Sequence, residues 1–497
     1  MKLGSLLADS GVKGGLTSAL HEIEITGLDY DSRRVESGYL FFAFSGAHVD
    51  GRGFARQAME KGAVAVAGEL PPPEGWQGPW IEVEHGRKAL AMAARRFYNA
   101  PDERIAITAI TGTNGKTTTS YLVDSILRAA GKTTALVGTI EYHIAGRRQA
   151  AVNTTPDSLE TYRILAELEQ ANGAHAIMEV SSHALALGRV WGVRFDTAVF
   201  TNLTRDHLDF HRTMEEYFAA KHLLFEGQPA PPRAAVINSD DPYGRQIRPP
   251  EGVRILRYGL ESSPEVTACA VESSFSGLRF ELGAPGVRFR VESPLVGRPN
   301  LYNILAACSA ALVQEIDIQS IARGIAECKG VPGRFEGVEA GQPFLVVVDY
   351  AHTDDALRNV IRVARQMTDK RVITLFGCGG DRDRSKRPLM GMAAAELSDF
   401  VVLTSDNPRS EDPLDIINDA LVGLRRFDTP HSVEPDRAKG IGIAIAEAKA
   451  GDVVILAGKG HETYQVLKDR TIDFDDREVA RRVLAGLGFN EGSAPFR

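Results

Sequence analysis

Residues 104–120 read RIAITAITGTNGKTTTS, and this stretch decides the fold. The apolar run at residues 104–110 is typical of a buried strand. A glycine-rich turn follows it, and residues 116–130 are predicted to form a helix. A strand, a tight glycine-rich turn and a helix in this order favour a phosphate-binding unit in an α/β domain.

The glycine-rich turn is a short form of the P-loop pattern G-x-x-x-x-G-K-[ST], because Ile110 stands where the first glycine is expected. Small residues let backbone N–H groups approach phosphate oxygens. Lys116 would bring a positive charge to the terminal phosphates, and Thr117 would place a hydroxyl on Mg²⁺. We therefore predict ATP and Mg²⁺ binding by Gly112, Thr113, Asn114, Gly115, Lys116, Thr117 and Thr118. Alone, the loop indicates a nucleotide hydrolase or a kinase-like fold.

Composition bounds the class of protein. The chain has 497 residues, so two to four domains are expected. A net charge of -8 argues against nucleic-acid binding through bulk electrostatics. No apolar stretch approaches the roughly 20 residues of a membrane span, and the N-terminal apolar run is too short for a signal peptide. The four cysteines form no C-x-x-C pair. We expect a cytoplasmic enzyme that binds neither nucleic acid nor membranes.

The chain changes character near residues 100 and 332, so we predict three α/β domains at residues 1–100, 101–332 and 333–497. In the first, strands are expected at 40–44 and 63–68, with helices at 53–62 and 87–101. In the second, strands at 104–110, 176–180, 197–203 and 234–238 alternate with helices, which implies a mostly parallel sheet. Residues 277–282 and 287–293 are expected to be an antiparallel pair appended to that sheet.

The third segment repeats one layout, an apolar strand that ends in a Gly- or Asp-rich loop. The repeats are residues 344–352, 371–381, 400–409 and 451–462. In open α/β sheets, ligands bind at the carboxyl ends of the strands. We therefore expect a second substrate at these loops.

Acidic and histidine side chains follow the strands of the second segment. Glu179 ends one strand, at the usual position of a Mg²⁺ contact beside a P-loop. The loop at residues 204–211 brings Asp206, His207, Asp209 and His211 together. Oxygen-rich ligation suits Mg²⁺ better than Zn²⁺. Lys221 has apolar helical neighbours, and the pattern alone favours a lysine whose head group reaches solvent.

Ten motifs, in this order, resemble the Mur ligases of peptidoglycan synthesis, and in particular the members that add 2,6-diaminopimelate. They are TGTNGKTT (111–118), EVSSHAL (179–185), NLTRDHLDFH (202–211), AAKHLLF (219–225), GRPNLYN (297–303), VPGRFE (331–336), DYAHT (349–353), GCGGDRDR (377–384), SDNPR (405–409) and GKGHE (458–462). The resemblance runs from about Asp31 to about Gln465. It implies an N-terminal UDP-binding domain, a central P-loop ATPase and a C-terminal Rossmann-like domain.

The resemblance also implies binding residues for two substrates. The UDP-sugar and its muramoyl-dipeptide would contact Tyr30, Ser32, Ala47, His48, Val49, Asn153, Thr154, Thr155, Ser181 and Arg189. The family often has a glutamine two residues before this arginine, where the chain has Leu187. ATP would contact Asn300, Asn303, Arg334 and Asp349 in addition to the P-loop.

The catalytic set implied by the resemblance is Lys116, Glu179, His207 and Lys221. Thr117, Glu179 and His207 would hold Mg²⁺. Lys221 matches the lysine that family members carbamylate. A carbamate converts an ammonium, which cannot bind a cation, into a carboxylate-like group that can lie near Mg²⁺.

The resemblance implies diaminopimelate specificity through Arg409, the last residue of the stretch Asp406, Asn407, Pro408 and Arg409. Diaminopimelate carries a second carboxylate, which a guanidinium can hold with two parallel hydrogen bonds. Lysine would place an ammonium there instead. Arg382, Gly458 and Glu462 match the other diaminopimelate contacts.

The expected function is an ATP-dependent ligase, acting as a monomer. It would join meso-2,6-diaminopimelate to the D-Glu γ-carboxylate of UDP-N-acetylmuramoyl-L-Ala-D-Glu through an acyl phosphate. Residues 331–334 would act as a hinge for closure of the C-terminal domain. Three alternatives stay open: a lysine-adding ligase, a ligase like folylpolyglutamate synthetase, and a P-loop switch without ligase chemistry.

Overall fold

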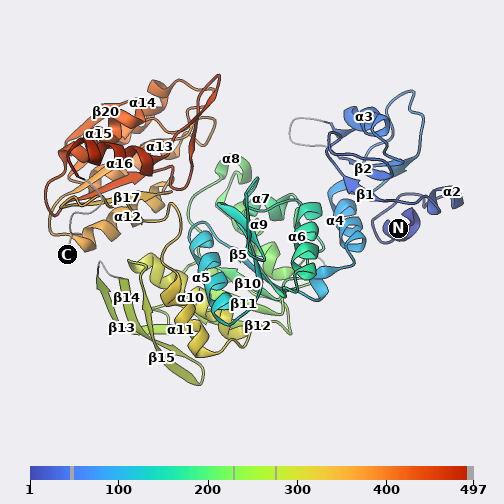
Figure 1. Cartoon of the computed structure of the whole chain (residues 1–497), viewed down its shortest axis with the longest axis horizontal. Helices are drawn as coiled ribbons and strands as arrows, with labels where there is room; N and C mark the ends of the chain where they lie inside the picture. The colour runs from blue at the N-terminus through green and yellow to red at the C-terminus, as the bar shows by residue number, and fades with distance from the viewer. Residues whose placement is uncertain (45–49, 228–229, 275–276, 490–497) are drawn as a thin grey trace.

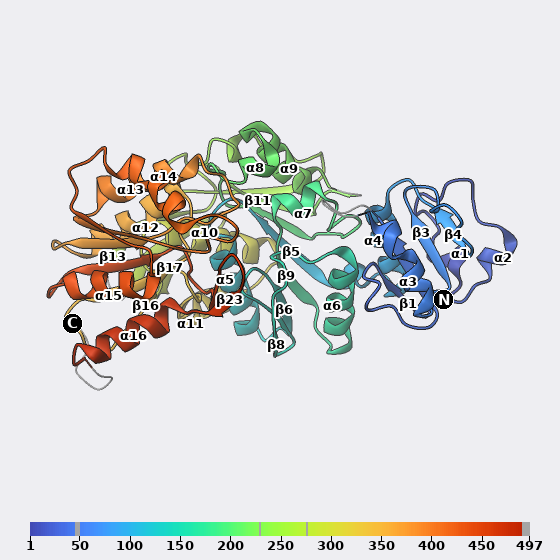
Figure 2. The same ribbon diagram turned by 90° about the horizontal axis from the view of Figure 1, so that it is seen from above.

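The computed structural model describes residues 1–44, 50–227, 230–274 and 277–489. Three α/β domains follow one another along an elongated molecule. The N-terminal domain lies at one end and the C-terminal domain at the other, with the central domain between them (Figures 1 and 2). This architecture confirms the predicted fold class. The exact domain boundaries stay predictions.

The N-terminal domain is built on a four-stranded parallel sheet in the order β1-β2-β3-β4. Apolar side chains pack on both faces, since the strands are almost wholly buried. The predicted helix at 53–62 is split into a 3₁₀ turn (Gly51–Phe54) and α3, and Asp50 caps the turn through its side chain. The elements are α1 (Leu3–Leu6), α2 (Ser18–His21), β1 (Gly27–Asp29), β2 (Tyr39–Ala43), α3 (Ala55–Glu60), β3 (Ala65–Gly68), β4 (Trp80–Glu82) and α4 (Gly86–Phe97).

The central domain contains an eight-stranded sheet in the order β12-β11-β10-β5-β9-β6-β7-β8. Strands β12 to β6 are parallel, as predicted, and β7 and β8 extend the sheet antiparallel. Strand β5 lies in the middle, so the turn that follows it opens onto the centre of the sheet edge. The strands are β5 (Ala106–Thr111), β6 (Thr134–Val137), β7 (Glu141–Ile144), β8 (Arg147–Ala150), β9 (His175–Glu179), β10 (Thr197–Phe200), β11 (Ala234–Asn238) and β12 (Arg254–Tyr258).

The helices of the central domain alternate with these strands and cover both faces of the sheet (Figures 1 and 2). Helix α5 packs against α10 and α11 on one face, whereas α6 faces α4 of the N-terminal domain. The helices are α5 (Lys116–Ala129), α6 (Ser158–Gln170), α7 (Ser182–Ala186), α8 (Leu208–His211), α9 (Met214–Glu226), α10 (Arg298–Val313) and α11 (Ile318–Glu327).

The antiparallel pair predicted at 277–282 and 287–293 forms, but it is not appended to the large sheet. Strands β13 (Thr267–Ser274), β14 (Gly277–Ala284) and β15 (Val287–Ser293) make a separate three-stranded sheet. Leu278, Phe280 and Val291 point into the same core as α10 and α11. The prediction was wrong because this small sheet has one apolar face, and it buries that face against α10 and α11 instead of extending the large sheet.

The C-terminal domain has a six-stranded sheet in the order β16-β17-β21-β18-β19-β20, parallel except for β16. All four predicted strand-loop repeats are present, and their loops leave one edge of the sheet. A two-stranded ribbon, β22-β23, follows. The elements are β16 (Glu336–Gly337), β17 (Leu345–Asp349), α12 (Asp354–Met367), β18 (Val372–Phe376), α13 (Lys386–Leu397), β19 (Phe400–Thr404), α14 (Pro413–Leu424), β20 (His431–Glu434), α15 (Arg437–Glu447), β21 (Val453–Ala457), β22 (Tyr464–Val466), β23 (Thr471–Asp473) and α16 (Asp476–Gly486).

Candidate active site

Two cavities lie where the central and C-terminal domains face each other. One has a volume of about 460 Å³ and the other about 290 Å³. Both are lined by Thr154, Ser181, Asp206, His207, Tyr350 and His352. The smaller cavity contains the P-loop, and the larger one contains the loops of the C-terminal sheet. The shared lining residues make them two compartments of one site.

The P-loop adopts a backbone that requires glycine at two positions. Gly112 has φ +148° and Gly115 has φ +86°. A Cβ at Gly112 would collide with Thr201 Oγ1, and one at Gly115 would collide with Asn303 Oδ1. Gly115 is also the N-cap of α5, so the positive end of a helix points into the smaller cavity. This arrangement suits the phosphates of a nucleotide.

Lys116 begins α5 and folds back over the loop. Its Nζ donates to the carbonyl oxygens of Gly112 and Thr113, each at 2.9 Å. Burial lowers the pKa of Lys116, although Glu179 and Asp206 oppose that effect. Both carbonyls belong to the loop itself, so the ammonium stays within reach of any phosphate bound there.

Glu179 and two threonines form an oxygen cluster beside the loop. Thr117 Oγ1 donates to Glu179 Oε2 at 3.0 Å, and Thr139 Oγ1 donates to the same oxygen at 3.1 Å. Thr139 N donates to Oε1 at 3.0 Å. The carboxylate is buried, so it is held in one place by its neighbours. Sequence reasoning missed Thr139, which lies in no recognised motif.

The oxygen cluster fits Mg²⁺, the metal ion predicted from the sequence. The donors are hydroxyl and carboxylate oxygens next to a phosphate loop, the ligands Mg²⁺ prefers. Among the residues that the structure describes, no group of three or more His, Cys, Asp or Glu side chains could hold a metal ion. Mg²⁺ suits such a sparse site, because it keeps several waters and uses phosphate oxygens.

Lys221 is buried, which corrects the expectation that its head group reaches solvent. The residue is 2% exposed, and its Nζ donates to Gly112 O at 2.9 Å and lies 4.7 Å from the centre of the Tyr217 ring. Burial and the charge on Lys116 hold the pKa of Lys221 well below its usual value. A lysine with a depressed pKa carries a free amine, the form that reacts with CO₂.

The histidines of the predicted loop face different partners. His207 Nε2 lies 3.4 Å from Asp206 Oδ2, and His352 of the C-terminal domain approaches the same oxygen at 3.9 Å. His211 instead contacts Ser182 Oγ at 2.9 Å and stacks on Tyr217. The sequence grouped His211 with Asp206 and His207, but His211 lines neither cavity and packs against α7 and α9 instead.

A slot between α10 and α12 extends the smaller cavity. Asn300 and Asn303 line the slot from α10, as predicted. Arg334 and Asp349 line it from the side of the C-terminal domain. Arg334 Nη2 donates to Thr117 Oγ1 at 3.4 Å. Helix α12 adds Ala356, Asn359, Val360 and Val363, which were missed because this helix shows amphipathic spacing and no motif. Phe335 was missed as well, although it lies within VPGRFE. The mixed apolar and amide lining suits a nucleotide base.

The larger cavity contains every predicted dipeptide residue of the central domain. Thr155 Oγ1 donates to Glu179 O at 2.9 Å and accepts from Ser181 N at 3.0 Å. Arg189 Nη1 donates to Thr155 O at 3.2 Å. Asn153 and Thr154 complete this wall. Dipeptide and phosphate-loop residues are therefore linked through Glu179.

Tyr30 connects the N-terminal domain to this region. Its hydroxyl donates to Asp157 Oδ2 at 3.0 Å, and Arg87 and Arg189 approach Oδ1 of the same carboxylate at 3.2 and 3.8 Å. Asp157 and Arg87 were missed by sequence reasoning. Ser32 Oγ donates to Gln57 Oε1 at 2.7 Å within the N-terminal domain. The predicted contacts Ala47, His48 and Val49 lie outside the described residues.

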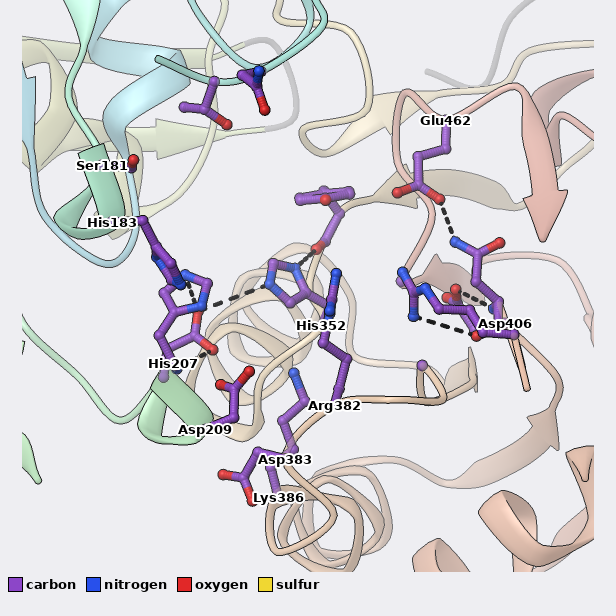
Figure 3. Close-up of a pocket in the computed structure, with 18 of the residues that line it drawn as sticks. Ser181, His183, His207, Asp209, His352, Arg382, Asp383, Lys386, Asp406 and Glu462 are labelled. Atoms are coloured by element: carbon purple, nitrogen blue, oxygen red, sulfur yellow. Dashed lines mark hydrogen bonds and ion pairs between the residues drawn. The ribbon is translucent and has the colours of Figure 1, made fainter. Parts of the chain in front are cut away.

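The opposite wall of the larger cavity is formed by the C-terminal loops (Figure 3). Asn407 Nδ2 donates to Glu462 Oε2 at 2.9 Å. Arg409 Nη1 donates to Gly380 O at 2.7 Å, and within the described residues its Nε and Nη2 make no hydrogen bond. The cavity lining includes the predicted Arg382, Asp406, Asn407, Arg409, Gly458 and Glu462, but not Pro408. A guanidinium with two donor nitrogens left over can hold a carboxylate.

Lys386 and Asp383 also line this cavity and were not predicted (Figure 3). Asp383 lies within the GCGGDRDR motif, and Lys386 lies two residues after that motif, at the start of α13. The charge of Lys386 lowers the pKa of His352, after the larger effect of burial. A lysine after a recognised motif gives no distinctive signal, so the fold was needed to place it.

Comparison with known proteins agrees with this geometry. Three family descriptions match the chain: the Mur ligase family catalytic domain at residues 24–98, the Mur ligase middle domain at 110–311, and the Mur ligase glutamate ligase domain at 333–460. A relative from Solibacter usitatus is 62% identical over 99% of this chain and 100% of its own length. Another, from Geobacillus thermodenitrificans, is 46% identical over 92% of this chain and 94% of its own. Both are named UDP-N-acetylmuramoyl-L-alanyl-D-glutamate–2,6-diaminopimelate ligase.

Solved structures extend the comparison. One UDP-N-acetylmuramoyl-L-alanyl-D-glutamate–2,6-diaminopimelate ligase matches with a TM-score of 0.70 and 33% identity, over 99% of this chain and all of the other. A folylpolyglutamate synthase from Mycobacterium tuberculosis shares the fold at 18% identity and a TM-score of 0.59, over 74% of this chain and 91% of its own. On the identity and coverage of these relatives, the chain belongs to the Mur ligase family.

Proposed function

We propose that this protein is the ATP-dependent ligase that adds meso-2,6-diaminopimelate to UDP-N-acetylmuramoyl-L-Ala-D-Glu in peptidoglycan precursor synthesis. The observation that carries the proposal is the pair of cavities that meet at Asp206, His207 and His352. A phosphate loop faces one compartment. The Arg409 guanidinium, whose Nε and Nη2 make no hydrogen bond to the part of the chain that the structure describes, faces the other. The names of the relatives match this pairing of a nucleotide with an acidic amino acid.

The chemistry follows from the order of the compartments. A free carboxylate does not react with an amine at neutral pH, so it must first be activated. The D-Glu γ-carboxylate attacks the γ-phosphorus of ATP, ADP leaves, and an acyl phosphate forms. The diaminopimelate amine then attacks the carbonyl carbon, phosphate leaves, and the amine gives up a proton. Binding both partners across one seam supplies proximity and orientation.

Residue roles follow from position. Lys116 neutralises charge that develops on the transferred phosphoryl group. Thr117, Glu179, His207 and a carbamate on Lys221 would hold Mg²⁺, which when bound supplies charge neutralisation at the phosphates. ATP also contacts Gly112, Thr113, Asn114, Gly115, Thr118, Asn300, Asn303, Arg334 and Asp349 in this proposal.

The nucleotide-sugar substrate spans two domains. Asn153, Thr154, Thr155, Ser181 and Arg189 hold the dipeptide end beside the phosphate loop. Tyr30 and Ser32, with residues 47–49, hold the UDP-sugar end. The bond from Tyr30 to Asp157 supports this path, because it brings the N-terminal domain to the mouth of the dipeptide wall.

Diaminopimelate occupies the larger cavity, in contact with Arg382, Asp406, Asn407, Arg409, Gly458 and Glu462, whereas Pro408 holds the backbone between Asn407 and Arg409. Its distal carboxylate pairs with Arg409, and its ammonium groups face the acidic side chains. We further propose that the enzyme works in the cytoplasm as a monomer, with domains at residues 1–100, 101–332 and 333–497. No helix among the described residues is long and apolar enough to cross a membrane.

The first experiment measures phosphate release with ATP, Mg²⁺ and UDP-N-acetylmuramoyl-L-Ala-D-Glu. Meso-diaminopimelate and L-lysine are added in parallel reactions. We expect turnover with diaminopimelate and a value of kcat/KM about 10³-fold lower with lysine, because a polar site rejects an analogue that leaves its charge unpaired. Preference for lysine would keep the ligase and overturn the specificity. ATP hydrolysis without amide formation would favour a switch protein instead.

A second experiment tests the carbamate on Lys221. Isotopically labelled bicarbonate should give a carbamate carbonyl signal by NMR in the native protein, because the buried amine has a depressed pKa. Lys221→Met should lose this signal and lower kcat by about 10²-fold, as expected when a metal-site group is removed. Lys439→Met, which changes an exposed lysine on α15, is the control and should keep the signal. A native spectrum without the signal at saturating bicarbonate would exclude the modification.

A further inference from the structure

We propose that Arg437 and Asp476 are positioning residues that fix the spacing of the two loops binding the amino-acid substrate. The loops are residues 405–409 and 458–462. This inference rests on the proposed function, and it deepens that function by naming what sets the amino-acid specificity from outside the cavity. Neither residue lines the cavity, and neither belongs to a sequence motif described above.

Arg437 and Asp476 form a fully buried ion pair. They are 1% and 0% exposed, and each is the first residue of a helix, α15 and α16 respectively. Arg437 Nε donates to Asp476 Oδ1 at 2.8 Å, and Nη2 donates to Oδ2 at 2.6 Å. The two helices pack against each other (Figure 1). The bidentate geometry fixes the plane of the guanidinium.

The remaining donors of Arg437 reach the ends of two strands. Nη1 donates to Ser405 O at 3.3 Å, and Nη2 donates to Ala457 O at 3.0 Å. Ser405 directly precedes Asp406, and Ala457 directly precedes Gly458. Strands β19 and β21 are not neighbours, because β18 lies between them. One side chain therefore ties together two loops that the sheet itself does not pair.

The loops that follow β18, β19 and β21 are closely packed against one another. A Cβ at Gly377, after β18, would lie 2.7 Å from Thr404 O and 2.9 Å from Asp406 N. A Cβ at Gly458 would lie 2.6 Å from Asp406 Oδ2. Such contacts are too short for a carbon atom, so the loops after β18 and β19 pack backbone to backbone, and the Asp406 carboxylate lies against the backbone of Gly458. A shift of either strand end then moves the side chains that face the cavity.

A second buried cation repeats the link nearer the cavity. Lys459 is 0% exposed, and its Nζ donates to Asn407 Oδ1 at 3.2 Å and to Glu462 Oε2 at 3.0 Å. Burial opposes the charge on Arg437, but Asp476, Asp406 and Glu462 together raise its pKa. The guanidinium therefore stays charged and attracts the same carboxylates that face the substrate. Figure 3 shows Asp406 and Glu462 on one wall of the cavity.

The test compares Arg437→Lys with the double variant Arg437→Met/Asp476→Leu. Lysine keeps the charge but cannot reach Asp476 and both carbonyls in one plane. We expect KM for diaminopimelate to rise about 10- to 100-fold, as for other supporting residues behind a site, while KM for ATP stays within about 3-fold. As KM for diaminopimelate rises, the ratio of kcat/KM for diaminopimelate to that for lysine should fall.

The double variant separates positioning from folding. It removes both charges, so no unpaired charge stays buried and the fold should persist. A positioning role predicts that it still shows the raised KM for diaminopimelate. Arg371→Lys is the matched control, because Arg371 pairs with Asp452 at 2.8 Å before β18, at the opposite edge of the same sheet. It should leave KM unchanged.

The outcomes are distinct. A native KM for diaminopimelate in both Arg437 variants, with a lower melting temperature alone, would overturn the inference and leave the pair a purely structural one. An equal rise in KM for ATP and diaminopimelate would overturn it as well, since the effect would not be local. Native protein that turns over with neither amino acid would instead overturn the proposed function.

Discussion

Lys116→Met is expected to lower kcat by about 10³-fold, the cost of removing one preorganised charge from a transition state. Methionine keeps the length of the side chain, so packing around the loop changes little. The lysine donates to Gly112 O and Thr113 O, which places its charge inside the phosphate loop. The effect should fall on the phosphoryl-transfer step rather than on recognition of the amino acid.

Single-turnover phosphate release with both co-substrates bound measures that step directly. Lys439→Met is the matched control, because this lysine is exposed on α15 and lies outside both cavities. It should retain native kcat. If Lys116→Met releases phosphate at close to the native rate, the loop does not bind the transferred group as proposed.

Arg409→Gln is expected to lower kcat/KM for diaminopimelate by about 10²- to 10³-fold, the usual loss when one partner of a buried charge pair is removed. Glutamine can still donate to Gly380 O, so the local backbone contact survives. What disappears is the pair of donors that faces the distal carboxylate. Discrimination against lysine should narrow at the same time, because the repulsion of its ammonium is also removed.

Parallel kcat/KM values for diaminopimelate and lysine test this. Arg384→Gln is the matched control: Arg384 pairs with Asp419 at 3.0 Å and does not line either cavity. It should leave both values unchanged. An Arg409→Gln variant that keeps the native ratio between the two amino acids would show that specificity lies elsewhere on the wall.

The sequence predicted the parts of this protein that depend on local chemistry. Gly112, Gly115 and Lys116 form the predicted glycine-rich turn between a strand and a helix, because small residues allow the positive φ angles that this turn needs. The strand-loop repeats of the C-terminal domain could also be predicted, since buried parallel strands appear in the sequence as apolar runs. The ordered motifs predicted that Arg409 and Glu462 contact the same substrate, and both residues line one cavity.

Long-range packing set the limit of that prediction. Lys221 looked like an exposed lysine, because helical spacing cannot show that another element covers a side chain. The strands at 277–293 were assigned to the wrong sheet, since alternation predicts strands and not their partners. Asp157, Thr139 and Arg437 each make a contact more than thirty residues away in the chain, to Tyr30, Glu179 and Asp476, and single-sequence patterns carry no signal for such pairs.

The seam shared by the two cavities has a consequence for how ATP is used. An acyl phosphate is a mixed anhydride that water hydrolyses readily. If it had to diffuse from one active site to another, hydrolysis would consume ATP without forming an amide. Thr154, Ser181 and His352 belong to both compartments, so under the proposed assignment the acyl phosphate would form directly beside the attacking amine. The arrangement of the two compartments would thereby couple ATP consumption to amide-bond formation.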